Sequence, residues 1–124
     1  MEERRRHARY KRADIALNVA RPGIKGILNV SPFSECLDFG IAGLQFGSSQ
    51  EFQVGERLIV DLRVFELEVR ELNAEVVSCE QKGDRMFCTN VRFCFELKRM
   101  QRPEISRVLL QIEDRLRMVQ QYPA

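Results

Sequence analysis

Two short segments of the chain carry side chains suited to binding a ligand that contains phosphate and a nucleobase. The first is Arg5-x-x-x-Arg9, within the run Arg4-Arg5-Arg6-His7-Ala8-Arg9 near the N-terminus. A guanidinium group donates two parallel hydrogen bonds to phosphate oxygens or to guanine O6 and N7, and its face can stack on a base. Because the two arginines are four residues apart just before a predicted strand, this arm could bring both to one ligand. The spacing predicts an anion clamp.

The second segment runs from Asp38 to Gly43 and places a carboxylate beside two glycines. A carboxylate is an acceptor for the N1 and N2 donors on the Watson–Crick edge of guanine. Gly40 and Gly43 would let the backbone turn sharply and a ligand approach closely. The same residues also suit a turn aspartate that bonds its own backbone and a β-bulge, and the residue types alone leave these alternatives open.

Composition limits what kind of protein can hold these segments. With 124 residues, 44% hydrophobic and 31% charged, the chain is predicted to fold as one domain around one core. The net charge is only +2, but six basic residues stand against Glu2 and Glu3 in the first dozen. The concentration of positive charge favours an anionic partner, with a solvated basic tail as the alternative.

Several classes of protein are disfavoured by what the sequence lacks. No stretch approaches the roughly 20 apolar residues of a membrane span, and no apolar secretory segment follows the N-terminus, so a cytoplasmic location is expected. The cysteines lack C-x-x-C spacing and His7 is the only histidine, so neither a metal site nor a cofactor is predicted. We expect buried, reduced thiols at Cys36, Cys79, Cys88 and Cys94.

Period-two alternation predicts that most of the chain forms strands. The first half contains alternation at Ile15, Leu17 and Val19, a turn at Pro22-Gly23, a strand from Ile24 to Val30, and a strand-like run from Cys36 to Phe46 bent at its glycines. The second half begins with a strand through Leu58, Val60 and Leu62, and the alternation then shifts phase between Val69 and Leu72, which is typical of a bulge or tight turn. A hairpin turn is predicted at Lys82-Gly83-Asp84. The strand that follows has one face formed by Met86, Cys88, Asn90 and Arg92.

The period changes after Pro103, where apolar residues recur every three or four positions and predict an amphipathic helix to about Gln121. Strands followed by one helix indicate a fold dominated by β-structure, a small antiparallel barrel of six or seven strands whose C-terminal helix covers an end or edge. We expect a flexible basic arm at residues 1–12 and a single domain at 13–124. The helix stripe predicted to be core consists of Ile105, Val108, Leu109, Ile112, Leu116 and Val119.

The two segments together resemble the motifs of the PilZ domain family, R-x-x-x-R followed by (D/N)-x-S-x-x-G. Here they read Arg4-Arg5-Arg6-His7-Ala8-Arg9 and Asp38-Phe39-Gly40-Ile41-Ala42-Gly43. R-x-x-x-R alone is a weak motif, whereas its place before the first strand and its pairing with the second segment make the combination more specific. The resemblance covers nearly the whole chain, since that family also has a six-stranded antiparallel barrel and a C-terminal helix.

The resemblance implies binding of the bacterial second messenger cyclic di-GMP. Arg5 and Arg9 would engage guanine and phosphate, Asp38 would engage a guanine edge, and Gly43 would be the final glycine of the motif. Arg4 is similar to the arginine that accompanies binding of a stacked pair of ligand molecules in some members.

The sequence departs from the pattern at Gly40, which stands where the motif has serine. The hydroxyl contact cannot be made, and one such hydrogen bond is worth about 0.5–1.5 kcal/mol. We expect binding weakened by roughly an order of magnitude.

Three functions follow from these observations. The first is a receptor whose basic arm closes over cyclic di-GMP and whose altered surface a downstream protein reads. The second is an adaptor of the same fold that binds a protein without nucleotide. A small barrel that binds single-stranded nucleic acid is disfavoured because most aromatic residues fall in core-like positions. Enzyme activity is not predicted, since no catalytic motif is present. A homodimer stays open.

Overall fold

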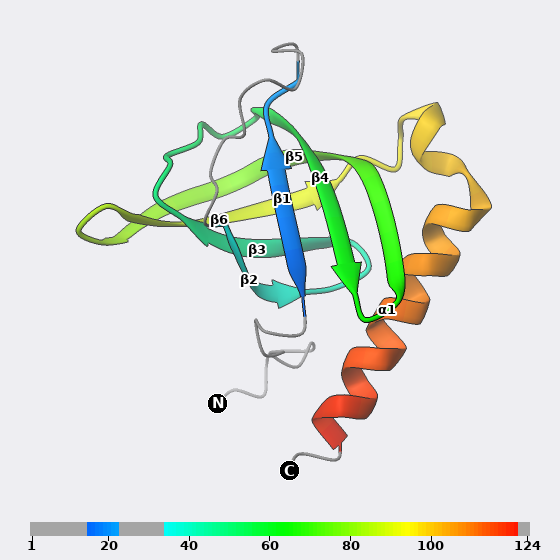
Figure 1. Ribbon diagram of the computed structural model, residues 1–124. Helices are drawn as coiled ribbons and strands as arrows, with labels where there is room; N and C mark the ends of the chain where they lie inside the picture. Colours follow the sequence, from blue (N-terminus) through cyan, green and yellow to red (C-terminus); the bar gives the residue numbers. More distant parts are fainter. Residues whose placement is uncertain (1–14, 23–33, 122–124) are drawn as a thin grey trace.

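The computed structural model describes residues 15–22 and 34–121 of the chain. Within these ranges the chain forms six strands, a short 3-10 helix and one α-helix (Figure 1). The predicted basic arm and the predicted strand from Ile24 to Val30 lie outside the described residues. The elements are β1 (Ala16–Ala20), β2 (Glu35–Phe39), β3 (Gly43–Ser48), β4 (Arg57–Val64), β5 (Leu67–Gly83), β6 (Met86–Phe93), η3 (Lys98–Gln101) and α1 (Pro103–Gln121).

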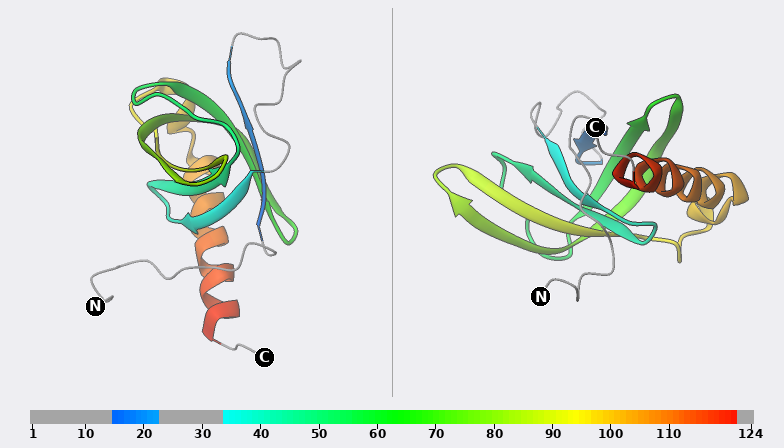
Figure 2. Two further views of the ribbon diagram at one scale, coloured as in Figure 1. Left: turned by 90° about the vertical axis from the view of Figure 1, so that its left-hand side faces the viewer. Right: turned by 90° about the horizontal axis from the view of Figure 1, so that it is seen from below.

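The strands form one antiparallel sheet in the order β1-β4-β5-β6-β3-β2. The sheet curls until its two edge strands, β1 and β2, have Cα atoms within 8 Å of each other, which gives a partly closed barrel (Figure 2). This architecture confirms the predicted fold class. Among the described residues no helix is long and apolar enough to cross a membrane.

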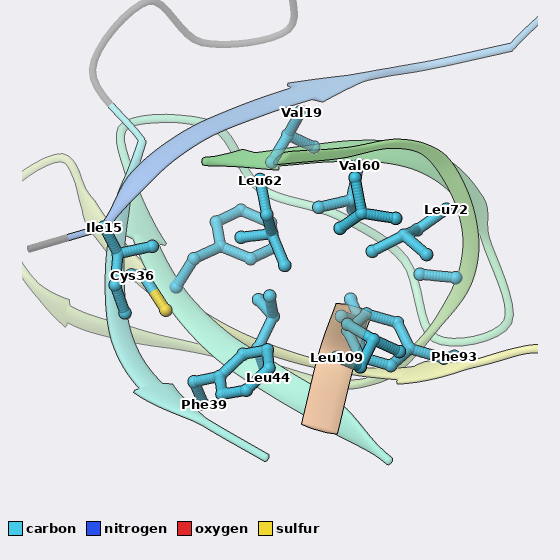
Figure 3. Close-up of a cluster of buried hydrophobic side chains, with 14 of the residues drawn as sticks. Ile15, Val19, Cys36, Phe39, Leu44, Val60, Leu62, Leu72, Phe93 and Leu109 are labelled. Atoms are coloured by element: carbon cyan, nitrogen blue, oxygen red, sulfur yellow. The ribbon is translucent and has the colours of Figure 1, made fainter. Parts of the chain in front are cut away.

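The core lies on the concave side of the sheet, where alternate residues of each strand meet. Val19, Val60, Leu72 and Phe93 are almost completely buried and converge from four different strands (Figure 3). Burial of such side chains contributes about 1.5–3 kcal/mol each. On β6, Thr89, Val91 and Phe93 face this core whereas Met86 and Arg92 face outward, as the alternation predicts.

Helix α1 covers one open end of the barrel, on the side of the β4–β5 hairpin (Figures 1 and 2). Leu109, Ile112 and Leu116 are 1%, 0% and 1% exposed, and Ile105 and Val108 pack against the same core. The predicted stripe is therefore confirmed at these five positions, while the side chain of Val119 lies outside the described part. The helix begins at Pro103, where the missing N–H of proline costs no hydrogen bond.

The phase shift predicted on β5 is a bulge. Val60 lies opposite Leu72 and Leu62 opposite Val69, so the register shifts between these pairs. At the bulge Glu71 has a φ of 58°, and its N–H donates a hydrogen bond to Asp61 Oδ1 at 2.8 Å. Asp61, which reads as an ordinary solvated strand residue, instead stabilises the bulge.

Two details differ from the sequence-based expectations. The β5–β6 turn is at Asp84-Arg85, with φ of 60° at Arg85, because Gly83 still pairs with Met86. The four cysteines are free, but only Cys36 and Cys94 are buried. Cys79 and Cys88 are half-buried, and Cys79 packs against the core with its Sγ 3.4 Å from Thr89 Oγ1.

Candidate ligand-binding site

The segment from Asp38 to Gly43 forms the β2–β3 hairpin. The Gly40 N–H donates to the Gly43 carbonyl at 2.9 Å, which closes the turn. The Phe93 N–H donates to the Ala42 carbonyl at 2.8 Å, which fastens the turn to the end of β6. The predicted sharp bend at the two glycines is confirmed.

Gly43 is at a point of close backbone approach. A Cβ built on Gly43 would lie 2.2 Å from the carbonyl oxygen of Val91 and 3.0 Å from the Cα of Arg92. Real Cβ atoms do not come that near a backbone oxygen, so β3 and β6 can pair here only if the residue is glycine.

A pocket of about 290 Å³ opens beside this hairpin. The three predicted site residues Asp38, Gly40 and Gly43 all line it. The other lining residues are Phe39, Ala42, Leu44, Gln45, Asn90 and Val91. Arg4, Arg5 and Arg9, the remaining predicted site residues, lie outside the described part of the chain.

A row of polar side chains runs across the outer face of the sheet at this pocket. Leu37 is an extra residue in β2, because the pairing passes directly from Cys36 opposite Phe46 to Asp38 opposite Gln45. Gln45 in turn lies opposite Asn90, and Asn90 opposite Ser78. Residues opposite each other in antiparallel strands point to the same face, so Asp38, Gln45 and Asn90 are neighbours there.

The Asn90 amide is held in place from β5. Its Nδ2 donates to Ser78 Oγ at 2.9 Å. The sequence pattern places Asn90 on the same face of its strand as Met86, Cys88 and Arg92 but does not connect it or Gln45 with the site, because the connection depends on strand register. The one sequence signal for this connection is the alternation of side chains along β3 and β6, which puts Gln45 on the same face as Gly43 and Asn90 on the same face as Arg92.

Arg92, also on the outward face, lies opposite Gly43 and is already paired. Its guanidinium donates to Glu96 at 3.1 Å and also to Glu75. These bonds, first to Glu96 and then to Glu75, raise the pKa of Arg92 further above its ordinary value, and the same contact lowers the pKa of Glu96. Arg92 therefore brings little uncompensated charge to the pocket.

The same pairing accounts for a group of acidic and thiol side chains. Glu75, Cys94 and Glu96 place potential ligand atoms within 4.8 Å of one another. Both carboxylates accept hydrogen bonds from Arg92, and burial raises the pKa of the Cys94 thiol. The Arg92 bonds are a sufficient reason for this grouping.

Cys36 supports the bulged part of β2 beneath the pocket. Its thiol is 3.6 Å from the Asp38 carbonyl oxygen, the range of a weak S–H···O hydrogen bond. Burial raises the pKa of the Cys36 thiol to about 12. Cys36 is therefore a neutral thiol at physiological pH and contributes packing to the site.

A curled six-stranded sheet, an end-capping helix and a pocket beside the β2–β3 hairpin define a small barrel with a candidate ligand site on its surface. The sequence matches the PilZ domain family over residues 3–111, and the chain belongs to that family. No curated protein sequence matches the chain significantly.

Two solved structures share the fold. The crystal structure of YcgR in complex with c-di-GMP from Escherichia coli aligns with a TM-score of 0.67 and 18% identity, over 95% of this chain and 48% of that one. The PilZ domain with c-di-GMP of YcgR from Escherichia coli aligns with a TM-score of 0.62 and 14% identity, over 95% of this chain and 98% of that one. The chain thus spans about half the length of the larger YcgR chain.

Proposed function

We propose that this protein is a receptor for cyclic di-GMP, which binds in the pocket beside the β2–β3 hairpin. The observation that carries the proposal is that Asp38, Gly40 and Gly43, the residues of the second sequence segment that suit a ligand, all line one pocket. The YcgR structures that share this fold contain c-di-GMP, which supports the same choice of ligand.

Asp38 is proposed to bind a guanine base. Its carboxylate can accept from both N1–H and N2–H, a pairing that adenine cannot offer. Gly43 also lines the pocket beside Asp38, and its lack of a side chain lets β3 pair closely with β6 at this point.

The negative charge of the ligand requires positively charged groups in addition to the residues that line the pocket. Cyclic di-GMP carries two phosphodiester anions, yet no residue of the described part that lines the pocket is a lysine or arginine. Arg92 is close in register but is paired with Glu75 and Glu96. We propose that Arg5 and Arg9 supply the missing cations from the N-terminal arm, with Arg4 adjoining them.

The proposed response to the ligand is closure of residues 1–12 over the pocket. A segment ordered by a bound anion changes the surface that a partner protein can read. On this proposal the protein is a cytoplasmic signalling module of a bacterium and acts by binding, without catalysis. Gly40, which removes the motif hydroxyl, favours the adaptor without nucleotide as the alternative function.

Calorimetric titration of the full chain with cyclic di-GMP tests the proposal. We expect saturable binding that is lost in Arg5→Ala and Arg9→Ala while the circular dichroism spectrum stays unchanged. Arg12→Ala is the matched control, because it removes one positive charge from the same region outside the motif and is expected to retain binding. Unchanged affinity in both motif variants would overturn the proposed clamp, and absence of binding by the native chain would favour the adaptor.

A further inference from the structure

Gln45 lies beside Asp38 in the pocket, and neither the family motif nor the sequence pattern assigns it a role. It faces Asp38 directly across the β2–β3 pairing, lines the same pocket and is half-buried. Among the described residues none forms a hydrogen bond with its amide, although the equivalent position on β6, Asn90, is bonded to Ser78. Gln45 therefore offers a donor and an acceptor at the pocket wall.

The spacing of the two side chains suits one edge of one purine. Side chains directly opposite each other in an antiparallel pair have Cβ atoms about 4.5–5.5 Å apart. The Watson–Crick edge of guanine presents N2–H, N1–H and O6 in a row, two donors followed by an acceptor. If the Asp38 carboxylate faces the two donors, guanine O6 lies beside the neighbouring side chain, Gln45. Because O6 is an acceptor, the group that complements it must be a hydrogen-bond donor.

We propose that Gln45 is a specificity-determining residue that donates from Nε2 to guanine O6 while Asp38 accepts from N1–H and N2–H. The inference rests on the proposed function and deepens it, because it names the atoms by which the site distinguishes guanine from adenine. Adenine has an amino group in place of O6 and an acceptor at N1, so it would oppose both protein groups. Cyclic di-AMP is therefore excluded by two mismatches.

Asn90 is a positioning residue in this arrangement. Its Nδ2 donates to Ser78 on β5, and Asn90 lies opposite Gln45 on β3, so in this proposal its Oδ1 is the acceptor on the Gln45 side. With the ligand bound, Oδ1 would accept one hydrogen of the Gln45 amide while the second hydrogen is directed to O6. Ser78 and Asn90 would thus favour the orientation of the Gln45 amide in which Nε2, the donor, faces the pocket.

Titrations with two ligands test the contact. Cyclic di-GMP and cyclic di-IMP both carry O6 and N1–H, and only the first carries the N2 amino group. Gln45→Leu is expected to weaken both ligands by the same factor, about threefold to tenfold. Asp38→Asn is expected to weaken cyclic di-GMP more than cyclic di-IMP, because the N2 contact exists only in the first. Gln53→Leu, the same change at an exposed position outside the pocket, should bind like the native chain.

The outcomes separate this inference from the proposed function. If the native chain binds cyclic di-GMP and Arg5→Ala does not, but Gln45→Leu binds both ligands normally, the role of Gln45 is overturned and the receptor stands. A loss confined to cyclic di-GMP would place Gln45 at N2 and overturn the O6 contact. Failure of the native chain to bind overturns both proposals. Thermal unfolding of Gln45→Leu serves as the check on folding, and Gln45→Met is the second variant should it unfold.

Discussion

Gly43 on β3 approaches the carbonyl oxygen of Val91 on β6 so closely that an added Cβ would lie 2.2 Å from it. This contact brings the β2–β3 hairpin tightly against β6, and Gly43 and Val91 both line the candidate pocket. The glycine that carries the resemblance to the family motif therefore has a structural reason that is independent of any ligand.

Gly43→Ala is expected to destabilise the fold by about 1–3 kcal/mol, because the obstructing atom is backbone and the two strands must separate. Urea unfolding of the variant and the native chain measures the difference. Gly83→Ala is the matched control, since a Cβ there meets nothing within 4 Å, and it should leave stability nearly unchanged. Equal stability of both variants would show that β3 and β6 tolerate a wider spacing.

At Glu71, in contrast to Gly43, the chain has a residue other than glycine at a position whose backbone conformation favours glycine. Its φ of 58° lies in the left-handed region, which costs residues other than glycine roughly 1–2 kcal/mol. Glycine loses more backbone entropy on folding, about 0.5–1 kcal/mol, so we expect Glu71→Gly to stabilise the protein by about 0.5–1 kcal/mol. The hydrogen bond to Asp61 uses the backbone N–H and is retained.

The measurement is again urea unfolding, with Arg63→Gly as the control. Arg63 is exposed on β4, and its φ is not among the positive values, so glycine there should destabilise. A loss of stability in Glu71→Gly as large as in Arg63→Gly would contradict the account of backbone strain.

The elements of the fold could be predicted because they depend on local periodicity. The alternation on β6 and the apolar stripe of α1 both survive in the structure, since each element buries one face against the core. The bulge near Glu71 was detectable as a phase shift, but its left-handed residue was not, because a glutamate carries no local signal for that conformation.

The candidate site was predictable only in part. Asp38, Gly40 and Gly43 lie within one six-residue segment that forms a single hairpin, so a short sequence motif identifies them. Gln45 and Asn90 join them through the register of three strands, which the extra residue Leu37 shifts by one position. A one-residue change of register reverses the face of every side chain, and periodicity alone does not determine it.

Gly40→Ser is expected to tighten cyclic di-GMP binding by about threefold to tenfold, the worth of one added hydrogen bond. Gly40 is buried in the turn and lines the pocket, so a hydroxyl there would be adjacent to the ligand. Calorimetry of Gly40→Ser beside Gly40→Ala separates the hydroxyl from the effect of the added Cβ. Equal affinity in both variants would mean that the hydroxyl makes no contact.

An ion pair between Glu66 and Arg115 joins the β4–β5 turn to α1. Arg115 donates to both carboxylate oxygens of Glu66, at 2.9 Å from Nη1, and its guanidinium lies 6.0 Å from the centre of the Phe65 ring. The hydrogen bond from Arg115 is the main reason that the pKa of Glu66 falls from 4.5 to about 2. A carboxylate whose pKa is lowered by folding stabilises the folded state at pH values above its unfolded-state pKa. That contribution is lost as the pH falls from about 4.5 to about 2.

Glu66→Gln should therefore be less stable than the native chain at pH 7, and the difference should disappear as the pH approaches 2. The effect is expected to be small, because both side chains are solvent-exposed and salt screens the pair. Chemical unfolding at several pH values, at low and high salt, measures it. In an Arg115→Ala background most of the pH dependence of the substitution at Glu66 should be lost, and the remainder is due to the hydrogen bond from the Glu66 backbone. A pH dependence as large as in the native background would assign the lowered pKa to a cause other than Arg115.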